Sequence, residues 1–208
     1  MFERDCRRCP RLADFLSSTQ QQHPDYYCGP VPPFGSSGAH LLIVGLAPGM
    51  HGANRTGRPF TGDHAGILLY ETLYEFGFSS SPYSENTDDK LQLLDCRITN
   101  AVKCLPPQNK PIGAEINTCN AFLANELRTL PEGAVVVALG GIAHRAIIRA
   151  VGGRQKDHKF GHAVEHQVLF NWKLLDSYHC SRYNTNTRRL TPKMFKDVFA
   201  RARYLLDH

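Results

Sequence analysis

The sequence lacks the apolar stretches that would carry a chain into or across a membrane. No run among its 208 residues approaches the roughly 20 apolar residues of a membrane-spanning helix. Residues 1–6 contain no apolar core of the kind that a secretory signal peptide needs. Internal repeats are absent, and the length suits one domain. We therefore expect a single cytoplasmic domain over residues 1–208 that does not contact a membrane.

Two common phosphate-binding motifs, G-x-x-x-x-G-K-[ST] and G-x-G-x-x-G, are also missing. This argues against a nucleotide-binding α/β protein. What the chain has instead is a long glycine-rich stretch, residues 45–63, between an apolar run at 41–44 and the start of a helical pattern at 65–70. Open α/β sheets bind ligands beyond the carboxyl ends of their strands, and long loops in compact domains are usually functional or disordered. The stretch therefore predicts a ligand site.

Alternating apolar runs and helical patterns predict the fold. We expect strands at 41–44, 97–103, 134–139, 164–170 and 173–178, and helices at 64–77, 113–128, 142–151 and from Pro192 onward, with Thr191 as the N-cap. The continuous apolar run at 134–139 is typical of a parallel strand buried on both faces. Together they predict a three-layer α/β/α sandwich around a central, mainly parallel sheet of about four strands.

Charge is unevenly distributed along the chain. The net charge is 24 − 19 = +5, and residues 181–208 alone carry seven basic side chains against two acidic ones. Such a concentration suits a polyanionic partner, but a solvated helix face would have the same composition. Charge alone leaves both interpretations open.

The seven cysteines are unlikely to form a disulfide framework in a reducing compartment. Cys6 and Cys9 form a C-x2-C pair, and Cys104 and Cys119 lie fifteen positions apart. Four thiolates can hold a zinc ion or an iron–sulfur cluster, and the spacing does not choose between them. The remaining cysteines are best interpreted as ordinary buried side chains: Cys28, Cys96 and Cys180.

Three stretches of the chain form recognisable motifs: residues 45–63 (GLAPGMHGANRTGRPFTGD), residues 179–185 (HCSRYNT) and residues 99–104 (TNAVKC). In this order they resemble the first motif, the second motif and the strand with a base-reading asparagine of family 5 uracil-DNA glycosylases. The resemblance runs from Cys6 to the last helix. It implies a monofunctional DNA repair hydrolase that excises uracil, and other deaminated or damaged bases such as hypoxanthine or ethenocytosine. The implied partner is double- or single-stranded DNA, bound by a monomer that is nucleoid-associated if prokaryotic.

The resemblance also implies a structural [4Fe–4S] cluster. Cys6, Cys9, Cys104 and Cys119 match the cluster ligands by position. The cluster would tie the N-terminal segment to the helix that follows residue 113. Only this analogy favours iron and sulfur over zinc.

By the same resemblance, Gly45, Ala47, Phe60 and Asn100 bind the base. Phe60 would stack on the flipped ring, worth roughly 1–3 kcal/mol, although simple core packing is its alternative. The amide of Asn100 can both donate and accept, which suits a pyrimidine edge. An asparagine within a strand, without such a role, would be a costly buried polar group.

The catalytic residues implied are His179, Asn54 and Asp63. His179 would hydrogen-bond the base oxygen as negative charge accumulates on the leaving group, and backbone N–H groups of residues 45–49 would assist it. Ala47 occupies the position where related families carry a polar residue, and it cannot polarise water. Asn54 would then position the water, or Asp63 would activate it, unless Asp63 only caps the following helix.

The second motif continues into residues that we expect to face DNA. Arg182, Asn184, Arg188 and Arg189 would contact phosphates, which adds salt-sensitive affinity without sequence preference. Tyr183 is a candidate wedge into the duplex, and Cys180 stands where the broader superfamily has proline. A rival hypothesis is an iron–sulfur protein that recognises damaged DNA with weak or no activity, since Ala47 removes the usual polar group.

Overall fold

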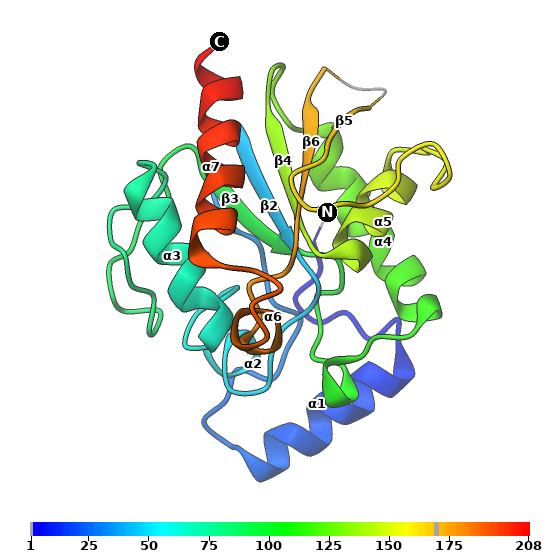
Figure 1. Ribbon diagram of the computed structural model, residues 1–208. Coiled ribbons are helices and arrows are strands. Elements are labelled where there is room, and N and C mark those ends of the chain that lie inside the picture. Colours follow the sequence, from blue (N-terminus) through cyan, green and yellow to red (C-terminus); the bar gives the residue numbers. More distant parts are fainter. Residues whose placement is uncertain (1, 169–170) are drawn as a thin grey trace.

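The computed structural model describes residues 2–168 and 171–208. Its centre is a sheet of six strands in the order β1-β3-β2-β4-β6-β5 (Figure 1). The four inner strands are parallel to one another: β3 (Cys96–Asn100), β2 (Leu41–Gly45), β4 (Val135–Leu139) and β6 (Lys173–Ser177). The α/β class and the parallel centre agree with the sequence prediction.

The prediction of a four-stranded sheet was wrong because the sheet is mixed and has two further strands. β1 (Phe34–Gly35) pairs antiparallel with β3 at one edge, and β5 (Glu165–Gln167) pairs antiparallel with β6 at the other. A strand of two residues such as β1 is too short to leave a readable alternation in the sequence, whereas β5 lies within the strand expected at 164–170. Of the strand expected at 164–170, residues 169–170 lie outside the described part of the chain.

The strand expected at 97–103 also ends earlier, at Asn100. Beyond it the backbone follows the start of the glycine-rich loop, because the N–H of Ala101 donates to the carbonyl of Gly45 and that of Val102 to Leu46. Asn100 therefore stands at the carboxyl end of β3, directly beside the carboxyl end of β2.

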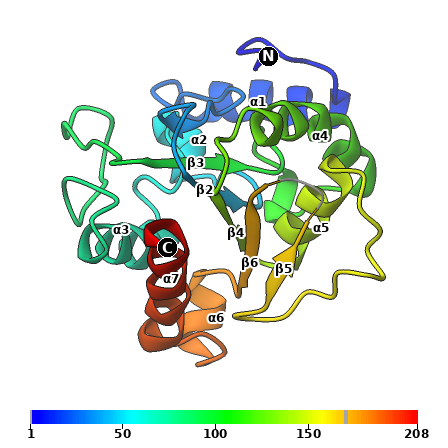
Figure 2. The same cartoon turned by 90° about the horizontal axis from the view of Figure 1, so that it is seen from above.

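Strand β2 shows how the chain builds two apolar cores. Leu41 and Ile43 pack with α3 (His64–Glu75) and α7 (Pro192–Asp207) on one face of the sheet. Leu42 and Val44 pack with α4 (Gly113–Arg128) and α5 (Gly141–Ala150) on the other. Successive side chains of a strand point to opposite faces, so a fully apolar strand needs helices on both. Figure 2 shows the two helix layers with the strands between them.

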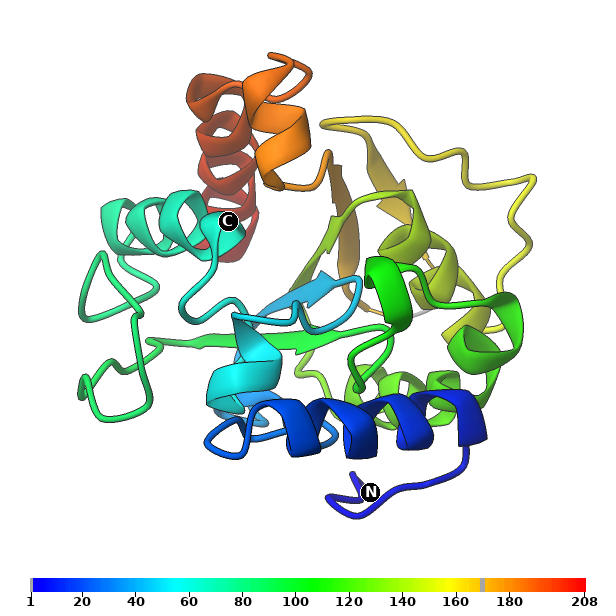
Figure 3. The same ribbon diagram turned by 90° about the horizontal axis from the view of Figure 1, so that it is seen from below.

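The N-terminal helix α1 (Pro10–Gln22) lies outside these layers, at the end of the molecule that also carries α2 (Ala53–Thr56) and α6 (Arg182–Asn186) (Figures 1 and 3). Leu12 anchors it in a third, small core with Val102, Cys119 and Phe122. No helix within residues 2–168 or 171–208 combines the length and apolar character that crossing a membrane requires.

Candidate active site

A cavity of about 420 Å³ opens where the parallel strands end. Its size and largely apolar walls suit a small organic ring. The glycine-rich loop after β2, the end of β3, the turn after β4 and the segment after β6 all contribute to it. The lining residues are Leu46, Ala47, Gly49, Ala53, Phe60, Asp63, Ala65, Asn100, Asn109, Leu139, Gly140, Gly141, Ile142, His179 and Ser181.

The ring of Phe60 is seated in the cavity by glycines. Phe60 has a φ of 55°, in the left-handed region, and only 6% of it is exposed. A Cβ atom on Gly45 would lie 2.7 Å from Cζ of Phe60, and one on Gly66 would overlap the carbonyl oxygen of Phe60. Phe60 both packs in the apolar core and lines the cavity, so the two sequence interpretations of this residue are compatible.

Asn100 presents an unused hydrogen-bond acceptor at the same cavity. It is 3% exposed, and its Oδ1 is enclosed without a hydrogen-bond partner among the residues that the structure describes. Buried polar atoms of native proteins are almost always paired. An orphaned amide oxygen at a cavity wall is therefore an indication that a ligand donates to it.

His179, two residues beyond the end of β6, is the second such group. Within the described residues its Nδ1 is enclosed and unpartnered, and burial lowers the pKa of His179 to about 4. The imidazole is thus neutral at physiological pH. Asn184 on α6 holds the segment in place, since its Nδ2 donates to the carbonyl oxygen of His179 over 2.9 Å.

Asp63 is the carboxylate that lines the cavity. Its Oδ1 accepts from the N–H of Gly66 over 2.8 Å and caps α3, as the sequence suggested. Burial raises its pKa above the ordinary value, an effect that hydrogen bonds from the backbone of Gly66 and Ala65 partly offset. Ala47, also in the lining, offers only a methyl group to the cavity.

The structure does not bring Asn54 to this cavity. Asn54 lies on α2, is fully buried, and its Nδ2 lies 3.5 Å from Sγ of Cys28. Its Oδ1 has no partner among the described residues, but it is enclosed behind the cavity wall rather than in the lining.

Sequence reasoning missed one wall of the cavity. Gly140, Gly141 and Ile142 follow β4 directly, and Asn109 ends the 3-10 helix Pro107–Asn109. The turn after β4 was detectable in principle, because the carboxyl ends of neighbouring parallel strands meet at one edge of the sheet. Asn109 carried no such signal, since only the fold brings its proline-rich turn to the loop after β2.

The surface beside the cavity carries basic side chains that form no ion pair with any residue in the described part of the chain. A second hollow shares Gly49, Asp63 and Asn109 with the cavity and reaches Arg182. Arg182, Arg188 and Arg189 are exposed, and the guanidinium of Arg189 lies 4.7 Å from the ring centroid of Tyr178. Neighbouring Tyr183 is 72% exposed.

The basic side chains of α7 are different, because acidic partners hold them. Lys193 pairs with Asp197, Lys196 with Glu75, Arg201 with Glu165 and Arg203 with Asp207. The basic side chains of residues 181–208 thus form two groups: those of α7 have acidic partners, whereas Arg182 on α6 lines the hollow that adjoins the cavity.

Four cysteines converge at the third core. Cys6, Cys9, Cys104 and Cys119 all line one small pocket beside α1, and the N–H of Lys103 donates to Sγ of Cys119 over 3.3 Å. Burial, and to a smaller extent the other three thiols, raise the pKa of Cys104 to about 12. The remaining thiols lie elsewhere: Cys96 and Cys180 are buried and Cys28 is half-buried.

Comparison with known proteins connects these features. A model of the "Uracil DNA glycosylase superfamily" matches residues 32–203. The type-5 uracil-DNA glycosylase of Thermus thermophilus is 45% identical over 205 residues, covering 96% of this chain and 93% of that protein. That of Pyrobaculum aerophilum is 40% identical, covering 95% and 88%. A crystal structure of wild-type Pedobacter heparinus SMUG2 shares the fold, with a TM-score of 0.52, 14% identity, and coverage of 82% of this chain and 76% of that one.

Proposed function

The chain belongs to the uracil DNA glycosylase superfamily, and we propose from this that it excises uracil from DNA. It hydrolyses the N-glycosidic bond and leaves an abasic site, as an enzyme of base excision repair. The relatives named type-5 uracil-DNA glycosylases match nearly the whole chain. Residues 32–203, which match the family model, include every cavity residue considered above.

One observation carries the proposal: Asn100 and His179 line the same cavity as Phe60, and Oδ1 of Asn100 and Nδ1 of His179 have no hydrogen-bond partner among the described residues. A base extruded from the duplex stacks on aromatic side chains and is recognised by hydrogen bonds to its edge. Oδ1 of Asn100 accepts from the N3–H of uracil. Cytosine has no hydrogen at N3, so the same contact discriminates against it.

His179 supplies the leaving-group stabilisation. Cleavage leaves negative charge on the departing base and positive charge on the sugar. A neutral imidazole has one N–H, which donates to a base oxygen without losing a proton. The low pKa of His179 keeps it in that neutral form at working pH. Backbone N–H groups of residues 45–49 would add to this oxyanion stabilisation.

Asp63 is the residue that would activate the attacking water. It is the carboxylate in the lining, whereas Asn54 is enclosed behind it and Ala47 is apolar. The cap on α3 uses Oδ1 of Asp63, which leaves Oδ2 for a water. Asn54 would act indirectly, by supporting the loop through Cys28. The small side chain of Ala47 leaves room for larger bases, and we propose hypoxanthine and ethenocytosine as further substrates.

We also propose that the four converging cysteines hold a [4Fe–4S] cluster, a structural group that supplies no chemistry to the reaction. The donor set is four thiols in one apolar pocket. A tetrahedral zinc with bonds of ~2.3 Å would hold its sulfurs ~4 Å apart. Among described residues, no three of these cysteines have sulfurs all within 4.8 Å of one another, which favours the larger cluster.

DNA would bind across the mouth of the cavity. Arg182, Arg188 and Arg189 would neutralise phosphates, while Asn184 acts by fixing the segment of His179. Tyr183 is the candidate wedge. We propose that one copy of the chain suffices, because all these groups come from a single chain.

The test is incubation with duplexes and single strands that contain uracil, hypoxanthine or ethenocytosine, followed by alkaline cleavage of abasic sites. We expect cleavage at uracil, at a rate about 100- to 1000-fold lower for a His179→Ala variant. If no base is released while DNA is still bound, the chain is instead a damage-recognising DNA-binding protein.

The cluster has its own test. Iron and sulfide analysis and visible absorption should show the iron–sulfur chromophore, which Cys104→Ala should remove and Cys28→Ala should keep. A colourless protein containing zinc would refute the cluster.

A further inference from the structure

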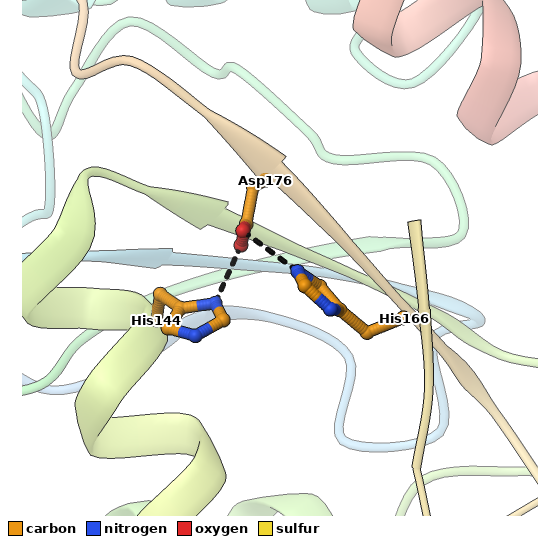
Figure 4. Close-up of side chains that lie close together, drawn as sticks. All are labelled: His144, His166 and Asp176. Carbon is orange, nitrogen blue, oxygen red and sulfur yellow. Dashed lines mark hydrogen bonds and ion pairs between the residues drawn. The ribbon is translucent and has the colours of Figure 1, made fainter. Parts of the chain in front are cut away.

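Three buried polar side chains that line neither the base cavity nor the four-cysteine pocket lie close together (Figure 4). They are His144 on α5, His166 on β5 and Asp176 on β6. Nδ1 of His144 lies 2.8 Å from Oδ1 of Asp176, and Nε2 of His166 lies 2.9 Å from Oδ2. The exposed fractions are 1%, 8% and 0%.

The hydrogen bonds around His144 require either a proton or a metal ion between its Nδ1 and the carboxyl group of Asp176. Its Nε2 lies 2.8 Å from the carbonyl oxygen of His158, which can only accept, so Nε2 carries a hydrogen. In a neutral ring the other nitrogen, Nδ1, then has only a lone pair. That lone pair faces a carboxylate oxygen of Asp176. Two electron pairs at hydrogen-bond distance repel each other unless a proton or a metal ion lies between them.

Burial of the carboxylate adds to this requirement. Asp176 has no exposed surface, and its Oδ2 also accepts from the N–H of Gly161 over 3.2 Å. A buried carboxylate is stable only when it is paired with a positive charge or bound to a metal.

We propose that His144, His166 and Asp176 form a metal-binding site for a divalent transition metal, with zinc as the best match. Two imidazoles and one carboxylate are a common zinc ligand set. The three ligand atoms all lie within 4.8 Å of one another, close enough to share one ion. The contact from His144 to the carbonyl of His158 is the kind of outer hydrogen bond that orients a metal-bound histidine.

The site would be structural rather than catalytic. Its ligands join α5, the edge strand β5 and β6, and its outer contacts come from His158 and Gly161 in the loop before β5. The centroid of the His158 ring lies 5.8 Å from that of His166, but its nitrogens are not among the ligand atoms within 4.8 Å of one another, so water is the candidate fourth ligand. The ion would fasten this loop and β5 to the strand that leads to His179.

The experiment measures zinc and iron per chain in protein purified without added chelator, by plasma mass spectrometry. We expect about one zinc per chain, in addition to any iron. His166→Gln and Asp176→Asn should lose the zinc. His162→Gln, a histidine of the same loop outside the ligand set, should keep it. Circular dichroism of each variant shows whether it has folded.

X-ray absorption at the zinc edge separates this site from zinc held by cysteines. We expect a first shell of nitrogen and oxygen without sulfur. If a variant does not fold, the zinc-edge spectrum of the unaltered protein alone shows whether nitrogen and oxygen or sulfur binds the zinc. Protein without zinc that also fails to take up added zinc or cobalt would overturn the proposal, leaving a protonated hydrogen-bond network. Zinc with a sulfur shell, or zinc kept by folded His166→Gln and Asp176→Asn, would overturn it as well.

Discussion

The rings of Phe60 and His179 lie side by side at the cavity, with centroids 5.9 Å apart and planes 28° from parallel. Phe60 comes from the loop after β2 and His179 from the segment after β6, so only the folded sheet unites them. A base stacked on Phe60 would have its edge near the imidazole. This arrangement supports the proposed roles, base binding for Phe60 and leaving-group stabilisation for His179.

Replacing His179 by alanine should therefore impair the chemical step and spare binding. Loss of one preorganised donor to a developing oxyanion typically lowers kcat about 100- to 1000-fold. Single-turnover excision and DNA affinity should be measured on the same variant. His40→Ala is the matched control, because His40 is exposed and pairs with Asp95 before β2 begins. A large loss of affinity in His179→Ala with an unchanged rate would contradict the assigned role.

Asn100→Ala should reduce kcat/KM for uracil about 10- to 100-fold, the cost of leaving the base edge unpaired in a buried site. The loss should be smaller for bases that lack an N3–H. Asn120→Ala serves as the control: Asn120 is also buried, but its Nδ2 donates to the carbonyl of Ala146 between α4 and α5. That variant should lose stability and keep its substrate preference, as compared by excision assays on several bases.

Asp63 has two roles that a pair of variants can separate. Asparagine caps a helix as well as aspartate does, so Asp63→Asn should keep the stability and lose activity. Asp63→Ala should lose activity and also about 1 kcal/mol of stability. In the unaltered protein, activity should fall as pH drops through the raised pKa of Asp63, because the carboxylate form is required. Denaturant unfolding measures the stability of each variant, and pH–rate profiles measure the pH dependence of activity. Full activity in Asp63→Asn would exclude Asp63 as the water activator.

The sequence predicted the features that depend on residues close together in the chain better than those that depend on tertiary contacts. The final helix with its Thr191 cap is confirmed, because the cap and Pro192 act within one helical turn. The edge strand β1 was missed, because a strand of two residues arises from pairing with β3 rather than from local pattern. The strand expected at 164–170 is confirmed over Glu165–Gln167, which form β5.

The site divides in the same way. Phe60, Asn100 and His179 were selected from motifs, and the structure brings them to one cavity. Asn54 was selected from the same loop, yet it lies on the short helix α2, where Ala53 lines the cavity and Asn54 does not. The triad of His144, His166 and Asp176 left no sequence signal, since its members come from three elements and meet only through the tertiary fold.

The low pKa of His179 has a consequence for stability. Its ordinary value is 6.5, and the folded value is about 4, so the unfolded chain binds more protons between these pH values. Stability must then rise with pH across this window and fall on acidification. From pH 7 to pH 5 the loss should be about 1–2 kcal/mol, allowing for the part of the ring that the cavity leaves exposed. Urea unfolding at both pH values should show this loss in the unaltered protein and not in His179→Asn; equal losses in the two would contradict it.

Salt dependence distinguishes the two groups of basic side chains. Arg182 is exposed at the hollow that adjoins the cavity, whereas Lys193 is exposed on α7 and paired with Asp197. Each phosphate contact contributes a slope of about −0.9 to the dependence of log K on log salt concentration. Arg182→Ala should weaken DNA binding equally across sequences and reduce the slope by about 1, while Lys193→Ala should change neither. Titrations of labelled duplex at several salt concentrations measure both quantities. If Lys193→Ala lost more DNA affinity and more of the salt slope than Arg182→Ala, the DNA would instead bind along α7 and not at α6.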